Sequence, residues 1–477
     1  MEKENKICGR IVTKILCRLD SPLLIGSGED RRTDSDVLVT ADGIPLIPGS
    51  AMAGGMRAYL EETAGRQEAE DLFGTLGWVQ QTEAERETAK LVPDYQSRIF
   101  VYDALLPNRG VIHRDGVRLD ERKTSKEYMK FDMEAVETGA DFCIRLEVCI
   151  REKNAEKDIN AAIERDLGRI RCIVSGIESG ALRLGARRNR GFGKLKILWG
   201  GYRVFQMDCR CDFEAWLDWN WGDESAFSQK EKKDWNELKL LKNEKGHCLE
   251  IPLRIQGTLL IRKYGAHAWD KETNEKAKDE IAVDYGQLLL EDGTAVIPGS
   301  TWAGAIRSYV AGLVRQIAGF DTWEQAQKAL EVFWGTWAPG EEKKQEKLWA
   351  SKVIMDETPI IGGHYLPVRR TAVDRFTGGA AKGALFSEGL WAGGKVNLTI
   401  RWSDRGLPPG GSEALCGMLL WAIQGIKDGL LAVGGETGVG RGIFEPAGNV
   451  YLNGQPMQEE KPYLLAAAQW CRKRREA

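Results

Sequence analysis

Two aspartates, Asp34 and Asp284, stand at the same point of a segment that occurs twice in the chain, 250 positions apart. A loop aspartate is most often a turn or cap residue. Here the aspartate recurs at the same position before the same hairpin and helix in both segments, and this recurrence favours a shared chemical role. A single carboxylate cannot hold Mg²⁺ alone, so waters and phosphate oxygens would have to complete its oxygen shell. Asp36 is a weaker candidate, because Gly286 stands at its partner position.

The repeated segments run from Asp34 to Leu60 and from Asp284 to Val310 and align without a gap. A spacing this long indicates a duplicated domain rather than a solenoid of short repeats. The identical pairs are Asp34/Asp284, Leu38/Leu288, Asp42/Asp292, Gly43/Gly293, Ile47/Ile297, Pro48/Pro298, Gly49/Gly299, Ser50/Ser300, Ala53/Ala303, Gly54/Gly304, Arg57/Arg307 and Tyr59/Tyr309.

Each copy places a second group of polar residues at the start of a helix. An Asp-Gly turn predicts a hairpin, Pro-Gly ends its second strand, and a serine is suited to cap the helix that follows. A serine, a glycine and an arginine then share one helix face, and free N–H groups beside them suit a phosphate. Tight helix–strand packing would also use small residues, but the second copy keeps this face while its core face changes. The residues are Ser50, Gly54, Arg57, Ser300, Gly304 and Arg307.

Late in each copy a helix runs into a glycine-rich loop. From Arg183 to Lys196 there are six basic residues, no acid and one aromatic, a composition typical of single-stranded nucleic-acid binding. The second loop, residues 434–442, lacks the Gly-Lys-Ser/Thr ending of a phosphate-binding NTPase loop and has one basic residue. The loop candidates for nucleic-acid contact are Arg187, Arg188, Arg190, Lys194 and Arg441.

In the middle of each copy a polar, basic excursion, residues 117–130 and 368–378, interrupts the pattern of strands. Charge runs are most often solvated faces, so these segments are weaker candidates than the glycine loops. The basic residues that could contact nucleic acid are Arg122, Lys123, Arg369, Arg370 and Arg375.

The elements that must position these residues follow one order in both copies: strand, helix, strand, excursion, strand, helix, strand. That order predicts an α+β fold of two tandem ferredoxin-like or RRM-like domains with inserted hairpins. Sheets of this kind commonly bind RNA. We place the domains at 1–205 and 249–455, with a charged, Trp-rich linker at 206–248 and a C-terminal helix and basic tail at 456–477.

Composition limits the alternatives. The 477 residues carry a net charge of −3, so a nucleic-acid site must be a local patch. Ten cysteines form no CxxC pair, which argues against a zinc module and is typical of thiols in a reducing cytoplasm. The start of the chain shows no apolar signal core, and no apolar run is long enough to span a bilayer.

Taken together, these motifs resemble the RAMP superfamily of CRISPR-associated proteins. The resemblance rests on a Gly-Ser-Gly loop, the aspartate, IPGS-x-x-x-G-x-x-R, an Asp-Arg-x-Thr-Gly turn at 374–378, and a late loop of the form GxRxxRGFGK. It covers residues 11–204 and 249–451 and is closest to the backbone subunits of type III effector complexes. Two copies in one chain resemble the tandem backbone subunits of variants such as subtype D.

The resemblance implies a scaffold that binds a guide CRISPR RNA and a single-stranded target RNA beside other type III subunits, with no membrane partner. Each domain would project a thumb-like hairpin, here residues 118–130 and 369–377, that interrupts the guide–target duplex. It also implies that Asp34 and Asp284 support cleavage of the target RNA with Mg²⁺ or Mn²⁺. The chain is then expected to be a metal-dependent endoribonuclease in the cytoplasm.

Two departures from the family pattern stand out. The first copy has Asp120-Glu121 where the second has Asp374-Arg375, and the second glycine loop loses four basic residues of the first. Two other functions remain open: a scaffold whose aspartates are inert, and an endonuclease that processes precursor guide RNA. The latter usually relies on histidine acid–base chemistry without a metal. None of the four histidines recurs between the copies.

Overall fold

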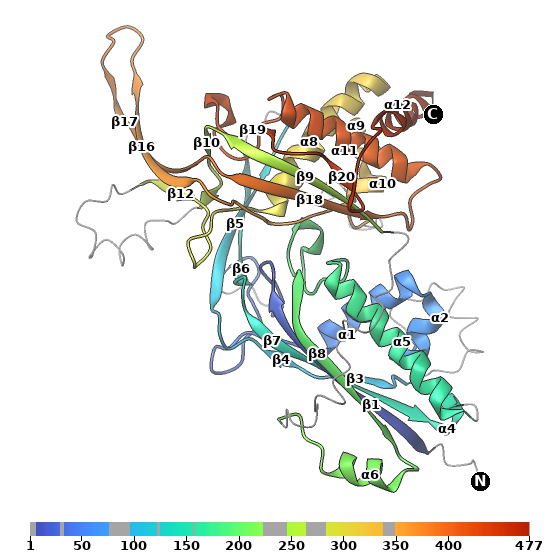
Figure 1. The fold of residues 1–477 in the computed structure, drawn as a ribbon. Helices are drawn as coiled ribbons and strands as arrows, with labels where there is room; N and C mark the ends of the chain where they lie inside the picture. Colours follow the sequence, from blue (N-terminus) through green and yellow to red (C-terminus); the bar gives the residue numbers. More distant parts are fainter. Residues whose placement is uncertain are drawn as a thin grey trace. The chain divides into compact units, whose positions relative to one another are not determined.

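The computed structural model describes residues 6–28, 33–75, 96–121, 125–155, 158–222, 246–263, 283–336 and 349–476 (Figure 1). Contacts within the chain divide it into two compact units. The first comprises residues 1–112, 134–188 and 193–244, and the second comprises 113–133, 189–192 and 245–477. Each unit is built on one principal antiparallel sheet.

The sheet of the first unit has the strand order β3-β7-β1-β8, and all its pairs are antiparallel. In chain order the framework alternates as β-α-β-β-α-β, the ferredoxin-like pattern. Helices α1 and α5 lie on one face of this sheet (Figure 1). The framework elements are β1 (Ile7–Leu19), α1 (Gly49–Thr63), β3 (Ile99–Val101), β7 (Asp141–Arg151), α5 (Ile159–Glu178) and β8 (Leu195–Gln206).

The second unit repeats the framework. Its sheet runs β14-β18-β9, with β19 and β20 on the free edge of β9. The two sheets therefore share one order, which confirms the predicted α+β fold and the duplication. The framework elements are β9 (Gly246–Gln256), α8 (Gly299–Ala318), β14 (Ile354–Met355), β18 (Lys395–Ser403), α11 (Gly411–Lys427) and β19 (Ile443–Pro446).

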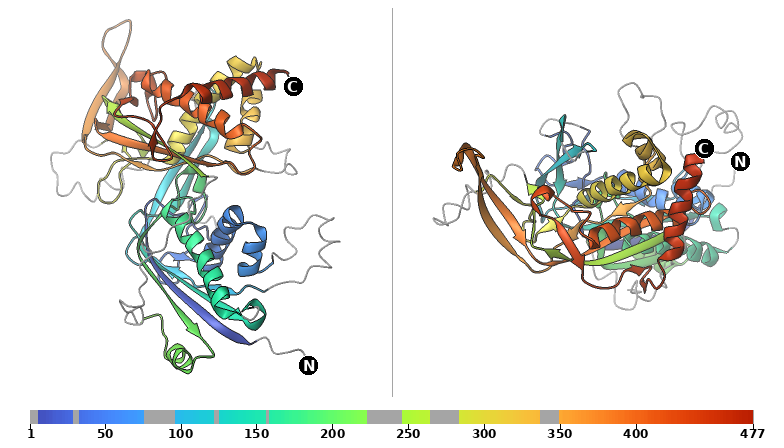
Figure 2. Two further views of the ribbon diagram at one scale, coloured as in Figure 1. Left: turned by 45° about the vertical axis from the view of Figure 1, so that its right-hand side comes forward. Right: turned by 90° about the horizontal axis from the view of Figure 1, so that it is seen from above.

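Both basic excursions form β-hairpins, β5–β6 and β16–β17, and β16–β17 extends away from the helices of its unit (Figure 2). The remaining elements before residue 245 are β2 (Leu46–Ile47), α2 (Arg66–Phe73), β4 (Ala104–Leu105), β5 (Val111–Leu119), β6 (Ser125–Val136), α4 (Glu152–Ala155), the 3-10 turn η2 (Arg188–Arg190) and α6 (Arg210–Leu217). Those after it are β10 (Thr258–Leu259), β11 (Arg262–Lys263), β12 (Tyr285–Gln287), β13 (Val296–Ile297), α9 (Trp323–Ala329), α10 (Glu331–Trp334), β15 (Thr358–Pro359), β16 (His364–Val373), β17 (Ala380–Ala392), η6 (Thr437–Val439), β20 (Tyr451–Leu452), β21 (Gln455–Pro456) and α12 (Lys461–Glu476).

The first helix of each unit begins two residues earlier than the sequence predicted. The N-cap residues are Pro48 and Pro298, and neither helix has a side-chain cap, so the expected serine caps are wrong. The glycine after each proline is needed for packing. A Cβ on Gly49 would lie 2.0 Å from the Val101 carbonyl oxygen, and one on Gly299 would lie 2.0 Å from that of Met355.

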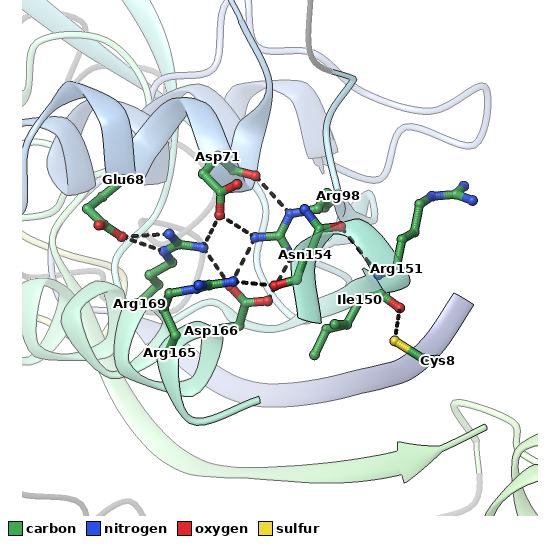
Figure 3. A network of polar contacts seen from close by, with 10 residues as sticks. All are labelled: Cys8, Glu68, Asp71, Arg98, Ile150, Arg151, Asn154, Arg165, Asp166 and Arg169. Carbon is green, nitrogen blue, oxygen red and sulfur yellow. Dashed lines mark hydrogen bonds and ion pairs between the residues drawn. The ribbon is translucent and has the colours of Figure 1, made fainter. Parts of the chain in front are cut away.

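A buried ion network ties α2, α5 and the start of β3 together in the first unit (Figure 3). The fully buried Asp166 accepts hydrogen bonds from Arg98 Nη1 at 2.7 Å and from Arg169 Nη1 at 2.6 Å. The same arginines reach α2, where Arg98 Nη2 donates to Asp71 at 2.7 Å and Arg169 Nη2 donates to Glu68 at 2.6 Å. Buried charges are tolerated only when they are paired in this way.

Candidate nucleic-acid interface

Asp34 and Asp36 have different environments in the first unit. The Asp34 side chain is exposed, whereas Asp36 is buried. Asp36 Oδ1 accepts hydrogen bonds from the backbone N–H of Thr33 at 2.8 Å and from its hydroxyl at 3.0 Å. Asp36 therefore stabilises the loop, and Asp34 is the carboxylate that a ligand can approach.

In the second unit Asp284 is also exposed and lies at the base of the β16–β17 hairpin. Its carboxylate Oδ2 accepts a hydrogen bond from the backbone N–H of Ser387 on β17 at 2.8 Å. The backbone N–H of Asp284 donates to the carbonyl of the same Ser387 at 2.8 Å. These two bonds fix the carboxylate next to the hairpin.

Neither aspartate belongs to a metal site formed by described side chains alone. Within the described ranges, no three or more His, Cys, Asp or Glu side chains gather closely enough to hold a metal ion. A divalent cation such as Mg²⁺ or Mn²⁺ would then need water and RNA phosphate oxygens as its other ligands.

The predicted phosphate face on α1 and α8 is formed only in part. Ser50, Gly54, Ser300 and Gly304 are exposed. Apart from the chain neighbours and the backbone of the same helix, no described atom lies within 4 Å of a Cβ built on either Gly54 or Gly304. Tight packing within the described chain therefore does not explain these helical glycines, whereas close approach of an external ligand would.

The arginines of this face point elsewhere. Arg57 is buried and donates to the carbonyl of Gly74, the C-cap residue of α2. Arg307 donates to the carbonyls of Trp334 at 3.1 Å and Gly335 at 3.3 Å, at the end of α10. Both therefore satisfy the unpaired carbonyls at a helix C-terminus. This geometry does not support the phosphate contacts predicted for them.

The two glycine loops share one backbone conformation. In the first, φ is positive at Gly185 (75°), Arg187 (56°), Gly191 (92°) and Gly193 (71°). In the second, φ is positive in the same order at Gly434 (102°), Glu436 (55°), Gly440 (83°) and Gly442 (71°). The last glycine is required in both loops. A Cβ on Gly193 would lie 1.8 Å from the Leu184 carbonyl oxygen, and one on Gly442 would lie 1.9 Å from that of Val433.

The charges on the two loops differ sharply. Arg188 and Arg190 are exposed and Arg187 is half-buried, so the first loop presents a cationic turn. Lys194 contributes less than predicted, because its Nζ lies 2.7 Å from Asp20 Oδ2. In the second loop Arg441, only 5% exposed, is paired with Glu388 and Glu436. Arg441 is therefore not placed to contact an RNA phosphate.

The β16–β17 hairpin separates its predicted arginines. Arg369 and Arg375 are exposed, whereas Arg370 is bound to Glu388 and, at 2.6 Å, to Glu436. Arg122 and Lys123 of the first hairpin lie outside the described residues. The predicted contact of Arg370 with RNA is thus not supported, because its guanidinium is already held by two carboxylates.

The tip of the second hairpin presents an aromatic ring. Asp374 Oδ1 accepts hydrogen bonds from the backbone N–H groups of Phe376 at 3.0 Å and Thr377 at 2.8 Å. The donation from Thr377 and then that from Phe376 lower the pKa of the Asp374 carboxyl. This Asx turn holds the Phe376 side chain in solvent, where it is 99% exposed.

The open face of the first sheet, in contrast, is covered by the chain itself. Residues 206–222 of the predicted linker lie in the described part of the chain, and Trp216, Trp219 and Trp221 pack on this face. Trp216 lies under the Arg10 guanidinium at 4.4 Å, and ring centroids are 6.1 Å apart for Trp219–Phe205 and 5.4 Å for Trp221–Tyr102. This part of the sheet is not a vacant stacking platform for RNA bases.

Sequence reasoning missed the carboxylates beneath the second hairpin. Glu388 is fully buried, and its oxygens accept from Arg370 and from Tyr285 Oη at 3.0 Å. Burial alone would raise the pKa of Glu388, but the hydrogen bonds from Arg370 and Arg441 hold it well below its usual range. Two signals were available in the sequence: both excursions end with a glutamate, Glu134 and Glu388, and Glu436 replaces an arginine of the first loop.

Comparison with known proteins agrees with this architecture. The RAMP superfamily model matches two regions, residues 16–196 and 250–445, one in each copy of the duplication. No curated protein matches the chain. Across the part of the chain that is described, no helix has the length and apolarity needed to cross a membrane. The matched regions coincide with the two ferredoxin-like frameworks and together cover most of the chain, which therefore belongs to the RAMP superfamily.

Proposed function

We propose that this protein is a backbone subunit of a type III CRISPR ribonucleoprotein that binds guide RNA and cleaves complementary target RNA. Membership of the superfamily indicates a CRISPR-associated, RNA-binding protein. The observation that carries the finer proposal is the recurrence of an exposed aspartate, Asp34 and Asp284, at the same point of both frameworks. A purely structural aspartate would more typically be buried in its loop, as Asp36 is.

Each part of the site has a distinct task in this proposal. The exposed glycines of α1 and α8 admit a phosphate backbone close to the helix. The arginines of the first glycine loop neutralise guide phosphates, and the second hairpin separates neighbouring bases. The aspartates bind Mg²⁺ or Mn²⁺, which supplies charge stabilisation at the scissile phosphate. Attack by the adjacent 2′-hydroxyl would leave a cyclic phosphate on one product and a 5′-hydroxyl on the other.

The direct test is to purify the assembled complex and sequence its RNA, then add labelled target complementary to that guide. We expect Mg²⁺-dependent products at regular spacing, lost with EDTA and restored by Mn²⁺. Products that persist in EDTA would instead support the precursor-processing alternative. If the complex contains guide RNA but cleaves no target with any metal, the protein is a scaffold and its aspartates are inert.

Neutralising the first glycine loop should weaken RNA binding regardless of sequence. The triple variant Arg187→Ala, Arg188→Ala, Arg190→Ala removes three cations, and each lost phosphate contact should reduce the salt slope of binding by ~0.7 for single-stranded RNA. The measurement is a binding titration at several salt concentrations. Arg254→Ala is the matched control, because this exposed arginine already pairs with Glu445 at 3.2 Å. A triple variant with the wild-type slope would mean that the loop contacts protein instead.

Removing the ring at the hairpin tip should weaken binding without changing the salt slope. Stacking of a base on an aromatic side chain contributes about 1–3 kcal/mol. We therefore expect Phe376→Ala to lower RNA affinity by about 5- to 150-fold, and Phe376→Trp to retain it. Leu385→Ala on the same hairpin, where the leucine is 63% exposed, is the control. Equal affinities for Phe376→Ala and wild type would exclude stacking at the tip.

A further inference from the structure

The position of Asp284 depends on a very short strand pairing. Strand β12 pairs in parallel with β17 at only two positions, Tyr285 with Glu388 and Gly286 with Gly389. The backbone and carboxylate bonds between Asp284 and Ser387 continue this ladder by one residue. A slip of one residue would turn each side chain to the opposite face, so the register decides where the carboxylate lies.

Side chains reinforce this short ladder at the residue next to the aspartate. The single hydroxyl proton of Tyr285 is shared between two carboxylates, with Oη 3.0 Å from Glu388 and 2.7 Å from Glu436. Arg370 from the other hairpin strand and Arg441 from the glycine loop hold Glu388 from two further directions. Three elements that are distant in sequence therefore converge on one buried carboxylate, directly beside the strand that carries Asp284.

Glu436, the other carboxylate that Tyr285 contacts, shows that the two glycine loops have different roles. Glu436 has the same left-handed conformation as Arg187, with φ of 55° and 56°. It binds Arg262 at 2.9 Å and Arg370 at 2.6 Å, which balances the charge of the arginines around Glu388. The second loop thus uses Glu436 and Arg441 to brace the hairpin base, whereas in the first loop Arg188 and Arg190 are exposed.

The first unit achieves a similar connection with different atoms. Glu134 on β6 is 2% exposed, and its Oε2 accepts a hydrogen bond from the backbone N–H of Val37 at 2.9 Å. The backbone N–H of Glu134 donates to the carbonyl of Ser35 at 3.0 Å. These bonds hold the residues that follow Asp34 against the second strand of the first hairpin.

We propose that Glu388 and Glu134 are positioning residues, each of which holds the segment that carries an aspartate against the second strand of its hairpin. This inference rests on the proposed cleavage at Asp34 and Asp284. Neither glutamate needs to touch RNA or metal. Each acts by fixing the carboxylate in the geometry for reaction, where a displacement of about 1 Å can reduce the rate by about 100-fold.

The test measures, in the assembled complex, the rate of each product band, the metal concentration for half-maximal rate, and the affinity for target. Glu388→Gln places an amide among three donors, so we expect a 10- to 100-fold slower Asp284-dependent cut. The half-maximal metal concentration for that cut should rise, while the Asp34-dependent cut and target affinity stay unchanged. Tyr285→Phe, which removes the donor without leaving a charge, should slow the same cut by a smaller factor.

In the first unit, Glu134→Ala should slow the Asp34-dependent cut alone, and Glu134→Gln should restore most of the rate because its amide oxygen still accepts from Val37. Glu445→Gln is the matched control, since this carboxylate is 44% exposed and lies on β19. Loss of assembly or of target binding in the Glu388 and Glu134 variants, with the Glu445→Gln control unaffected, would assign the two glutamates a merely structural role.

The failure of this inference differs from the failure of the proposed function. One outcome would exclude positioning by Glu388 and still support cleavage at Asp284. In that outcome Asp284→Ala abolishes a product band, whereas Glu388→Gln and Tyr285→Phe each form the same band at a rate within twofold of wild type. If Asp284→Ala itself leaves every band in place, the second site does not cleave, and there is nothing for Glu388 to position.

Discussion

Asp34→Ala in the assembled complex is expected to abolish one cleavage product, and Asp284→Ala a different one. The two aspartates stand at the same point of two separate frameworks, so each should serve its own interruption of the guide–target duplex. A metal ion at the scissile phosphate provides several kcal/mol of transition-state stabilisation. Because 1.36 kcal/mol is a factor of ten, each cut should slow by at least about 100-fold.

The binding of target should survive both substitutions, because neither carboxylate neutralises phosphate charge. Asp36→Ala is an informative comparison: it should loosen the loop through Thr33 and lower stability, yet leave both products visible. The double variant Asp34→Ala, Asp284→Ala should bind target RNA and form neither of the two cleavage products assigned to these aspartates. If Asp284→Ala keeps the full ladder, the second copy is a scaffold only. If Asp34→Ala keeps it as well, another subunit is the nuclease.

Asp166→Ala is expected to cause the largest loss of stability in the first unit. It leaves the Arg98 and Arg169 guanidiniums, each 6% exposed, without their fully buried partner, and only the partly exposed Asp71 then bridges them. Removing one partner of a buried ion pair typically costs about 3–5 kcal/mol. In a unit of this size that corresponds to a fall of about 6–20 °C in the melting temperature. Hydrogen exchange should rise in α2 and α5 and remain unchanged in α11.

The matched control for this network is Glu70→Ala on the surface of α2. Glu70 pairs with Arg66 at 2.7 Å, but the Arg66 side chain is 66% exposed, so the change should stay within about 0.5 kcal/mol. Equal melting temperatures for Asp166→Ala and Glu70→Ala would show that the buried network does not stabilise the unit.

Acid should weaken the same network. Burial alone would raise the pKa of Asp71, but the Arg98 and Arg169 charges outweigh it, so the folded-state pKa lies below the ordinary 3.8. A carboxyl with a lowered pKa contributes stability that is complete above its unfolded value and is lost as the pH falls through the folded one. We therefore expect the α2–α5 contact to weaken as the pH drops below about 4, measured by hydrogen exchange of α2.

Much of the framework followed from local patterns in the sequence. The 27-residue repeat, the apolar stripe that became α5 and the Asp-Gly turns depend on neighbours within a few residues, and these were read correctly. Because the domain is duplicated, the order of elements predicted for one copy could be compared with that predicted for the other. The strand order then followed, because β-α-β-β-α-β units with short connections have few ways to pair.

What the sequence could not decide was which charges face outward. Arg57, Arg307, Arg370 and Arg441 all stood in plausible RNA-binding motifs, yet each is held by helix carbonyls or buried carboxylates. The same holds for Trp216, Trp219 and Trp221, which were predicted in a linker and lie on the first sheet. A guanidinium or a ring contacts whichever partner the fold brings within reach, and those partners lie from 17 residues away (Arg57 and Gly74) to more than 200 (Arg10 and Trp216). The sequence by itself therefore determined the two frameworks and their candidate aspartates, while only the tertiary structure decided which cations remain available to RNA.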